Sequence, residues 1–278
     1  MTGCWAVAHA HAEALAQAQA TRRDPAMSER LPEVLLRGTG ISRRWGGLVA
    51  VDRVSIDLTR GTVHAVIGTT GAGKSTLINI LSGELPPSAG RVELLGQDVT
   101  GWTQPRRARA GLNRSYQRST IYPTFSVFEN CRLAAQAQTQ RPWRWWQDAQ
   151  ACEASTGAAR EVAARAGLSD WLDRPAGLLS HGQKRQLEIA MCLATAPQVL
   201  LLDEPLAGMG AEETDRMLAL LSDLRAGHAI LLVEHDMDAV FRIADRITVM
   251  VNGAVIASDT PDAVRASPEV QAAYLGGC

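Results

Sequence analysis

The chain has few cysteines, and they are not spaced as a disulfide or zinc framework requires. Its 278 residues include five cysteines, Cys4, Cys131, Cys152, Cys192 and Cys278, with no CxxC pair among them. An odd number of scattered cysteines argues against a disulfide-stabilised fold and indicates a reducing compartment. A structural zinc site is equally unsupported.

Long apolar runs and a strong charge of one sign are missing as well. No stretch approaches the ~18 apolar residues that a membrane-spanning helix needs, and the longest aliphatic runs, 199–202 and 230–233, have the length of strands. A net charge of -1 gives no support for whole-chain binding to nucleic acid or anionic membranes. The Ala-rich start lacks a basic region and is interrupted by His9, His11 and Glu13, so we expect no signal peptide. We expect a cytosolic protein that reaches a membrane only through a partner.

Composition divides the chain into an N-terminal extension and one large domain. Residues 1–31 are rich in Ala, Gln and His, so we predict a disordered extension there. Residues 32–278 carry the apolar pattern of a folded domain, and 46% of the whole chain is hydrophobic, which is enough for a full core. Within this domain, the stretch from about 104 to 180 has a helical composition and is predicted to form a helical subdomain.

Short apolar runs alternate with helical segments through the domain. Strands are predicted at 34–36, 54–58, 63–67, 92–95, 199–202, 230–233, 246–251 and 255–258, and further helices at 77–81 and around 217–224. Asn252-Gly253 is a strong hairpin signal, and Thr260-Pro261 and Ser267-Pro268 are each typical of a helix start. Buried strands that alternate with helices predict an α/β fold with a mostly parallel sheet covered on both faces.

A glycine-rich loop follows the predicted strand 63–67 and leads into an apolar helix. It fits the pattern GxxxxGK[ST] and comprises Gly68, Thr69, Thr70, Gly71, Ala72, Gly73, Lys74, Ser75 and Thr76. Glycines let the backbone curl so that its N–H groups face a phosphate, and the helix start adds its positive end. In this pattern the Lys74 ammonium reaches the β- and γ-phosphates, and the Ser75 hydroxyl ligates Mg²⁺. The loop therefore predicts a nucleotide site.

Two carboxylates, Asp203 and Glu204, follow the predicted strand 199–202. A carboxylate at the end of a buried strand is costly unless a cation faces it. Asp203 fits a partner of Mg²⁺ through water, and Glu204 fits a general base aimed at the attacking water. An ordinary strand-to-loop cap is the alternative interpretation, which the phosphate loop upstream weakens.

Between these motifs lies Leu179-Ser180-His181-Gly182-Gln183, which resembles the LSGGQ signature of the ABC ATPases. The resemblance extends over roughly residues 33–276. It implies a P-loop NTPase of ABC type, with a mostly parallel core sheet, an N-terminal antiparallel β subdomain and an inserted helical subdomain. It also implies that two such domains bind ATP head to tail. Ser180, Gly182 and Gln183 of one domain then belong to the nucleotide site of the other.

Three further residues match the family's motifs by order and spacing. Gln117 matches the Q-loop glutamine that senses Mg²⁺ and the γ-phosphate, and His235 matches the switch histidine. Trp45 occupies the A-loop position, where an aromatic ring stacks on adenine. The resemblance thus implies Glu204, His235 and Gln117 as catalytic residues. It places Ser75, Gln117 and Asp203 around Mg²⁺.

The sequence departs from the family's pattern at two positions. His181 replaces the first of the two signature glycines, and a side chain there is expected to point away from the nucleotide. Gly210 stands where the D-loop usually has an aspartate, so a contact made by that side chain between subunits is in doubt.

Several segments look most like the ATPases of branched-chain amino-acid, urea and amide importers. These are 46–51, 207–209, 233–241 and 273–276. The resemblance implies an ATP-hydrolysing subunit that powers uptake through separate integral membrane permeases. It also implies a second ABC ATPase subunit, identical or paralogous, and a periplasmic or extracellular solute-binding protein. The subunit is then expected to be cytoplasmic and peripheral on the inner face of the cell membrane, with no nucleic-acid partner.

Two clusters in the segment 104–178 are compatible with more than one role. Trp143, Trp145 and Trp146 lie beside arginines, and three interpretations stay open: a satellite core, a groove for a permease helix, or stacking on nucleic acid. A basic run is typical of a solvated face, although it lies near where a permease would dock; it consists of Arg106, Arg107, Arg109, Arg114 and Arg118.

Two other function classes are compatible with a phosphate loop. A soluble ABC ATPase that acts on nucleic acid usually carries coiled-coil or zinc insertions or a second ATPase domain, for which 278 residues with one phosphate loop leave no room. A different P-loop enzyme, such as a small-molecule kinase, would leave residues 179–183 and His235 without a role. ATPase activity insensitive to DNA and RNA, with co-purification of an integral membrane protein, would separate the three classes.

Overall fold

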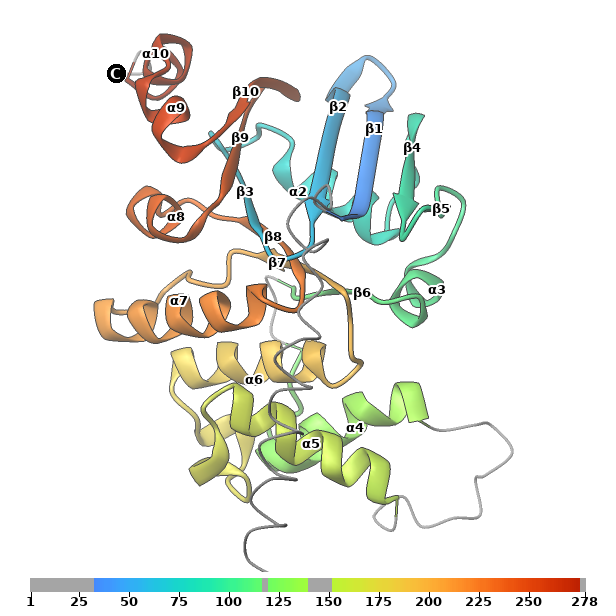
Figure 1. Cartoon of the computed structure of the whole chain (residues 1–278), viewed down its shortest axis with the longest axis vertical. Coiled ribbons are helices and arrows are strands. Elements are labelled where there is room, and N and C mark those ends of the chain that lie inside the picture. Colours follow the sequence, from blue (N-terminus) through green and yellow to red (C-terminus); the bar gives the residue numbers. More distant parts are fainter. Residues whose placement is uncertain (1–32, 117–119, 140–151, 276–278) are drawn as a thin grey trace, which may run out of the picture. The chain divides into compact units, whose positions relative to one another are not determined.

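The computed structural model describes residues 33–116, 120–139 and 152–275 and contains two β-sheets with helices around them (Figure 1). The strands are β1 Val34–Trp45, β2 Leu48–Thr59, β3 Val63–Gly68, β4 Ala89–Leu94, β5 Gln97–Asp98, β6 Leu112–Arg114, β7 Val199–Asp203, β8 Ala229–Val233, β9 Arg246–Val251 and β10 Ala254–Asp259. The helices are α2 Lys74–Ser82, α3 Gln104–Arg109, α4 Val127–Thr139, α5 Glu153–Arg165, α6 His181–Leu193, α7 Ala211–Arg225, α8 Met237–Ile243, α9 Pro261–Ala266 and α10 Pro268–Leu275, with short 3-10 turns η4 Ser169–Trp171 and η5 Ala176–Leu178.

The larger sheet has the strand order β10-β9-β3-β8-β7-β6, in which all neighbours from β9 to β6 are parallel and β10 is antiparallel. Both faces of its central strands are buried, which explains their nearly continuous aliphatic sequences. In β7, Leu200 and Leu202 enter one hydrophobic cluster while Val199 and Leu201 enter another on the opposite face. The predicted parallel sheet is therefore confirmed.

The smaller sheet is antiparallel and has the order β2-β1-β4-β5. Alternate residues of its strands pack with α2 and one face of the larger sheet, and Leu36, Ile56 and Val92 are typical members of this cluster. The sheet is the N-terminal antiparallel subdomain that the family resemblance implies. It brings the start of β2 beside the phosphate loop, as described below.

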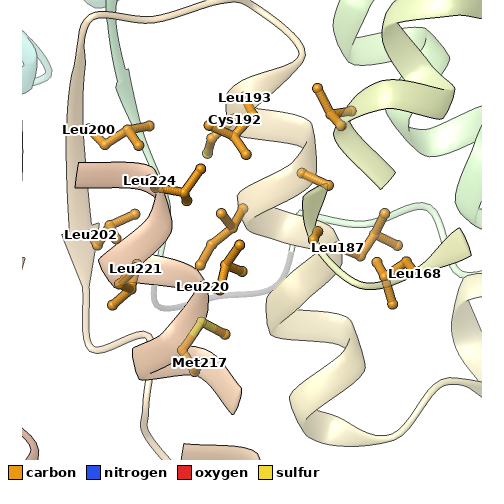
Figure 2. Close-up of a cluster of buried hydrophobic side chains, with 14 of the residues drawn as sticks. Leu168, Leu187, Cys192, Leu193, Leu200, Leu202, Met217, Leu220, Leu221 and Leu224 are labelled. Carbon is orange, nitrogen blue, oxygen red and sulfur yellow. The ribbon is translucent and has the colours of Figure 1, made fainter. Parts of the chain in front are cut away.

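A helical layer covers the other face of β7 and β8. Leu221 and Leu224 of α7 lie on the side of the strands, and Leu220 lies between α7 and α6 (Figure 2). Leu187 and Leu193 of α6 belong to the same cluster. Helices α4 and α5 pack on α6. The layer thus holds α6 and α7 side by side, with their N-terminal ends near each other.

The C-terminal part contains the hairpin predicted at Asn252-Gly253. Both residues have positive φ, 48° and 83°, which a two-residue hairpin turn of this type requires. The Thr260 side chain accepts a hydrogen bond from the Ala263 amide and caps α9, as predicted. Helices α8 and α9 and the start of α10 cover the β3–β9 side of the sheet in a third cluster.

Two predictions in the segment 104–178 are wrong. Leu112–Arg114 is a strand, β6, that extends the parallel sheet beside β7, although the whole segment has a helical composition. Arg107 and Arg114 are buried, so the basic run is not simply a solvated face. Arg106 and Arg109 are exposed, and Arg118 lies outside the described residues. The three tryptophans at 143, 145 and 146 and the extension 1–31 also lie outside them. Within the described ranges, no helix is both long and apolar enough to cross a membrane.

Candidate nucleotide site

The phosphate loop connects β3 to α2 through backbone conformations that only glycine adopts easily. Gly71 and Gly73 have φ of 81° and 96°. A Cβ on Gly73 would lie 2.3 Å from the Ala50 carbonyl oxygen, and one on Gly68 would lie 2.2 Å from that of Met250. The loop is therefore closely packed between β2 and β9. A side chain at Gly68 or Gly73 would clash with these carbonyl oxygens and distort the phosphate loop.

Lys74 is the first residue of α2 and is only 5% exposed. Its ammonium donates hydrogen bonds to the carbonyl oxygens of Gly68, at 2.7 Å, and Thr69, at 3.0 Å. Burial lowers the pKa of Lys74, and the nearby carboxylates of Glu204 and Asp203 oppose that shift. The ammonium is thus held at the loop, where it faces the negative charge that a triphosphate would bring.

Asp203 ends β7 and is almost fully buried. Its Oδ2 accepts a hydrogen bond from the Arg114 guanidinium at 2.9 Å, which forms an ion pair. Its Oδ1 is buried and has no hydrogen-bond partner within the described part of the chain. Burial raises the pKa of Asp203, and Arg114 and Lys74 counteract this. One carboxylate oxygen is therefore anchored and the other is left available for a further ligand.

Arg114 was missed as a site residue because it stood in an ordinary-looking basic run. Besides Asp203, its guanidinium donates to Glu84 at 2.9 Å and to Asn79 and Ser82 of α2. It lies three residues before Gln117, which is outside the described residues. Arg114 therefore links the C-terminal end of α2 to the C-terminal end of β7 through hydrogen bonds. The sequence gives no sign of this role, because it depends on the burial of the arginine in the fold.

Glu204 follows Asp203 and has a left-handed backbone conformation, with φ of 51°. Its amide donates to the Val233 carbonyl oxygen at 2.8 Å, which fixes the turn after β7. Its Oε1 lies 2.7 Å from His235 Nε2, and the carboxylate requires that nitrogen to carry the proton. The buried Glu234 accepts from the amides of Leu206 and His235, so it binds the two loops together.

One cavity of about 310 Å³ collects most of the residues predicted to bind nucleotide. Its walls include Glu204 and His235, and the full lining is Ala50, Thr70, Gly71, Ala72, Gly73, Lys74, Ser75, Thr76, Glu204 and His235. A triphosphate in this space would meet the loop amides, the Lys74 ammonium and the Glu204–His235 pair. The arrangement suits hydrolysis of a phosphoanhydride.

Trp45 lies at the exposed end of β1 and is not part of that lining. Its side chain is 45% exposed, and the Arg43 guanidinium lies 4.9 Å from its ring centroid. Trp45 pairs with Leu48 across the hairpin that leads to Ala50 in the cavity wall. The ring is accessible to a ligand, and its exposure is inconsistent with a core role.

The signature residues line a different cavity of the same chain, of about 290 Å³. Its lining comprises Gly167, Trp171, Ser180, Gly182, Gln183, Gln186, Glu213 and Arg216. Ser180 caps α6 in a capping box with Gln183, since each side chain bonds the other's backbone amide. Gln183 therefore shapes the start of α6. The structure does not bring these three residues to the phosphate loop of their own chain.

The two departures from the signature and D-loop patterns have simple structural settings. The His181 ring points at the loop after β7, where its Nε2 donates to the Ala207 carbonyl oxygen at 2.9 Å. Gly208 has φ of 77° and lies against the same ring. A Cβ at Gly210 would meet nothing within 4 Å, so the backbone there leaves room for the first atom of a side chain.

The family model for the ABC transporter matches residues 51–207. That segment contains the phosphate loop, the signature and the acidic strand end, and it is more than half of the chain. The chain belongs to the ABC transporter family. A second model, for the branched-chain amino acid ATP-binding cassette transporter, matches residues 254–277 of this ABC chain.

Curated relatives cover nearly the whole ABC chain. The high-affinity branched-chain amino acid transport ATP-binding protein LivG of Escherichia coli (strain K12) is 38% identical over 256 residues, with 88% of this chain and 99% of LivG covered. BraF of Pseudomonas aeruginosa, a protein of the same description, is 37% identical over 249 residues, with 87% and 98% covered. These relatives give no support to a nucleic-acid ATPase or a small-molecule kinase.

Solved structures agree with the fold of this ABC chain. The ATP-binding cassette of an ABC transporter in its ADP conformation has a TM-score of 0.79 and 30% identity, and covers 88% of this chain and 99% of its own. A nucleotide-free cassette gives a TM-score of 0.78 at the same identity. The chain is therefore a nucleotide-binding ATPase of ABC type, which confirms the resemblance drawn from the signature motif.

Proposed function

We propose that this chain is the Mg²⁺-dependent ATPase subunit of an importer for branched-chain amino acids, urea or related amides. The observation that supports it most directly is the cavity that joins the phosphate loop to Glu204 and His235. The solute class rests on the 254–277 match and on the amino-acid transport relatives. The transported solute passes through separate permeases and contacts no residue of this chain.

The residues around Asp203 fit a magnesium ion. Mg²⁺ prefers oxygen ligands and keeps several waters. The buried Oδ1 of Asp203, which has no hydrogen-bond partner among the described residues, could bind such a water. The Ser75 hydroxyl in the cavity wall would hold the ion directly, and Gln117 is the third candidate. When bound, the ion would neutralise phosphate charge during hydrolysis.

Glu204 is the general base in this proposal. Its carboxylate lies in the cavity that receives the phosphates, and His235 holds it through the 2.7 Å hydrogen bond. The base takes a proton from the attacking water, while Lys74 and the loop amides bind the phosphate oxygens. His235 keeps the carboxylate oriented between turnovers.

The second half of each nucleotide site comes from another ATPase subunit, identical or paralogous. Ser180 and Gly182 stand at the N-terminal end of α6, where backbone N–H groups and the helix dipole favour an anion. They line a cavity separate from the phosphate loop of their own chain. A head-to-tail pair would bring each signature to the γ-phosphate on the opposite phosphate loop.

An apolar surface patch is the proposed contact for a permease on the inner face of the membrane. Tyr122 and Phe125 are exposed, and their rings stack with centroids 5.6 Å apart. Leu178 is 64% exposed and lies on a segment tied to the first by the 2.8 Å bond from the Gly177 amide to the Pro123 carbonyl oxygen. Exposed apolar side chains gathered in this way mark protein contacts. The apolar side of a permease's cytoplasmic helix would fit them.

Two variants test the ATPase proposal. Glu204→Gln should bind Mg-ATP normally but hydrolyse it ~10²–10⁴ times more slowly, so an ATP-bound dimer should accumulate. Lys74→Ala should lose nucleotide affinity and therefore dimerisation. Size-exclusion chromatography with Mg-ATP, with phosphate release measured on the same samples, compares both with the unchanged protein. Near-normal hydrolysis by Glu204→Gln would remove Glu204 from the base role.

The solute is tested by uptake in a strain that lacks the gene. Labelled leucine, isoleucine, valine, urea and acetamide are compared, with Glu204→Gln as the matched inactive complement. Loss of uptake of one solute, restored by the unchanged gene only, identifies the class. Unaltered uptake of all five would contradict the proposed importer class.

A further inference from the structure

The Glu213 carboxylate occupies the anion-binding position of the signature motif. Glu213 lies in the first turn of α7, and its Oε1 accepts a hydrogen bond from the Ser180 hydroxyl at 3.0 Å. The same oxygen accepts from the Gly182 amide at 3.3 Å. These are the two groups that the proposed function assigns to a γ-phosphate. A carboxylate oxygen therefore stands where a phosphate oxygen of the opposite subunit would have to lie.

The fit of this carboxylate depends on the glycine at 182. A Cβ at that position would lie 2.6 Å from Cδ of Glu213 and 2.7 Å from its Oε1. The hydrogen bonds from Ser180, Gly182 and Gly210 lower the pKa of Glu213, with Ser180 the largest cause. Glu213 is therefore bound as an anion, as a phosphate would be.

Hydrogen bonds hold the Glu213 carboxylate at the signature, but the surrounding space allows its side chain to move away. Glu213 is half-buried, and it lines the 290 Å³ cavity beside the signature, so its side chain has space to turn. Arg216 lines the same cavity one helical turn further on. An (i, i+3) pair on a helix places opposite charges near each other. If the Glu213 carboxylate leaves the signature, it can therefore form an ion pair with the Arg216 guanidinium.

We propose that Glu213 sets the ATP affinity of the paired state, because its carboxylate competes with the opposite subunit's γ-phosphate for Ser180 and Gly182. The proposal rests on the head-to-tail pairing of the proposed function. When two copies of this chain pair, two such carboxylates must be released, one at each signature. The equilibrium for pairing is reduced by the occupancy of the competing state. Removing the carboxylate should thus favour the ATP-bound dimer.

The test uses the full chain with Glu204→Gln, so that hydrolysis does not deplete the dimer. Sedimentation measures the ATP concentration at half-maximal dimerisation with and without Glu213→Gln. We expect roughly a ten-fold lower concentration when both competing charge-assisted hydrogen bonds are weakened. Glu212→Gln is the matched control, because it removes the same charge from the same helical turn at an exposed position. It should leave the midpoint within about two-fold.

A lower affinity or an unchanged midpoint in Glu213→Gln would overturn the proposal, since Glu213 would then support the signature or do nothing. A second measurement does not need a dimer. Inorganic phosphate is titrated against the isolated chain while NMR follows the Gly182 amide. The amide should respond at lower phosphate concentration in Glu213→Gln than in the unchanged chain, and identical titrations would reject the competition. If Glu204→Gln never dimerises with Mg-ATP, the proposed pairing fails while the phosphate titration still decides the role of Glu213.

Discussion

His64 in β3 is a buried histidine that the fold keeps neutral. Its Nδ1 donates to the Asp57 carbonyl oxygen at 3.0 Å, so its Nε2 is left to accept from the Thr248 hydroxyl at 2.8 Å. Burial lowers the pKa of His64 from 6.5 to about 4. Between these values the unfolded chain binds a proton that the folded chain excludes. The histidine therefore contributes to the pH dependence of stability.

Protonation of His64 in the unfolded chain lowers the stability of the fold at acidic pH. Above pH 6.5 the titration of His64 does not change the free energy of unfolding. As the pH falls from 6.5 towards 4, the free energy of unfolding decreases by about 1.4 kcal/mol per unit of pKa difference. We expect the free energy of unfolding to drop over this window by up to about 3 kcal/mol from this residue. Urea unfolding of the unchanged protein and of His64→Gln, across pH 4.5 to 7.5, measures how much of the pH dependence of stability comes from His64. If the free energy of unfolding changed with pH in the same way in both proteins, this contribution of His64 would be contradicted.

Trp45 is expected to stack on adenine. Base–aromatic stacking is worth roughly 1–3 kcal/mol, so Trp45→Ala should weaken ATP binding about five- to a hundred-fold. Tyr or Phe at this position should largely restore the affinity. Because the ring is 45% exposed, the melting temperature should change little. Fluorescent-nucleotide titration and thermal unfolding measure both effects. A selective loss of stability with unaltered affinity would assign Trp45 to packing.

Among single residues, those whose chemistry depends on local spacing could be predicted from the sequence. The phosphate loop was recognisable because Gly71 and Gly73 meet a backbone requirement that no other residue satisfies easily. Arg114 and Glu213 were not recognisable, because each acquires its role from a contact across the fold. Their partners Asp203 and Ser180 are 89 and 33 residues away along the chain.

At the scale of elements, α2 depends on a residue outside it. Its C-terminal end is closed by Gly83 in a left-handed conformation and by the fully buried Arg107 of α3. The Arg107 guanidinium donates to the carbonyl oxygens of Ile80 and Leu81, both at 2.8 Å, and to that of Thr100 at 3.0 Å. The Ile80 oxygen also accepts from the Gly83 amide, whereas Arg107 satisfies the Leu81 oxygen, one of the carbonyls that a helix end leaves without an intrahelical partner. Arg107 therefore supports the helix that begins with the phosphate loop.

Replacing Arg107 should destabilise the protein strongly. Arg107→Met keeps most of the side-chain volume but removes the donor to the buried carbonyl oxygens of Leu81 and Thr100. Each of these costs about 1–3 kcal/mol when it remains dry and unsatisfied. We expect the free energy of unfolding to fall by at least about 2 kcal/mol. Arg109→Met, on the exposed side of the same helix, is the control and should change it by less than about 0.5 kcal/mol. Equal effects of the two substitutions in urea unfolding would refute the capping role.

Strands that are longer and buried on both faces were easier to predict from the sequence than short strands at a sheet edge. β7 and β8 were found because each is a run of aliphatic residues buried on both faces. β6 was missed because three residues, Leu-Asn-Arg, carry no period, and its place is decided by pairing with β7. A short strand at a sheet edge is specified by its neighbour more than by its own sequence.

At the scale of the whole molecule, the N-terminal extension should be dispensable. Residues 1–26 precede Met27, and their composition gives little apolar surface to offset the entropy of ordering. A chain that begins at Met27 should keep its melting temperature and its ATPase rate. Calorimetry and phosphate release on both lengths provide the check. A large loss of either quantity would mean that the extension packs on the domain.

The phosphate loop is enclosed by segments that are far away along the chain. Gly73 packs against Ala50 and Gly253, Gly68 packs against Met250, and β3 pairs with β8 and β9. During synthesis on a ribosome the loop therefore emerges long before its surroundings. At the usual 5–20 residues per second, roughly ten to forty seconds separate the translation of the loop from that of residue 253. A nascent chain stalled before β9 should not bind nucleotide, so ATP cannot guide the early steps of its own site's assembly.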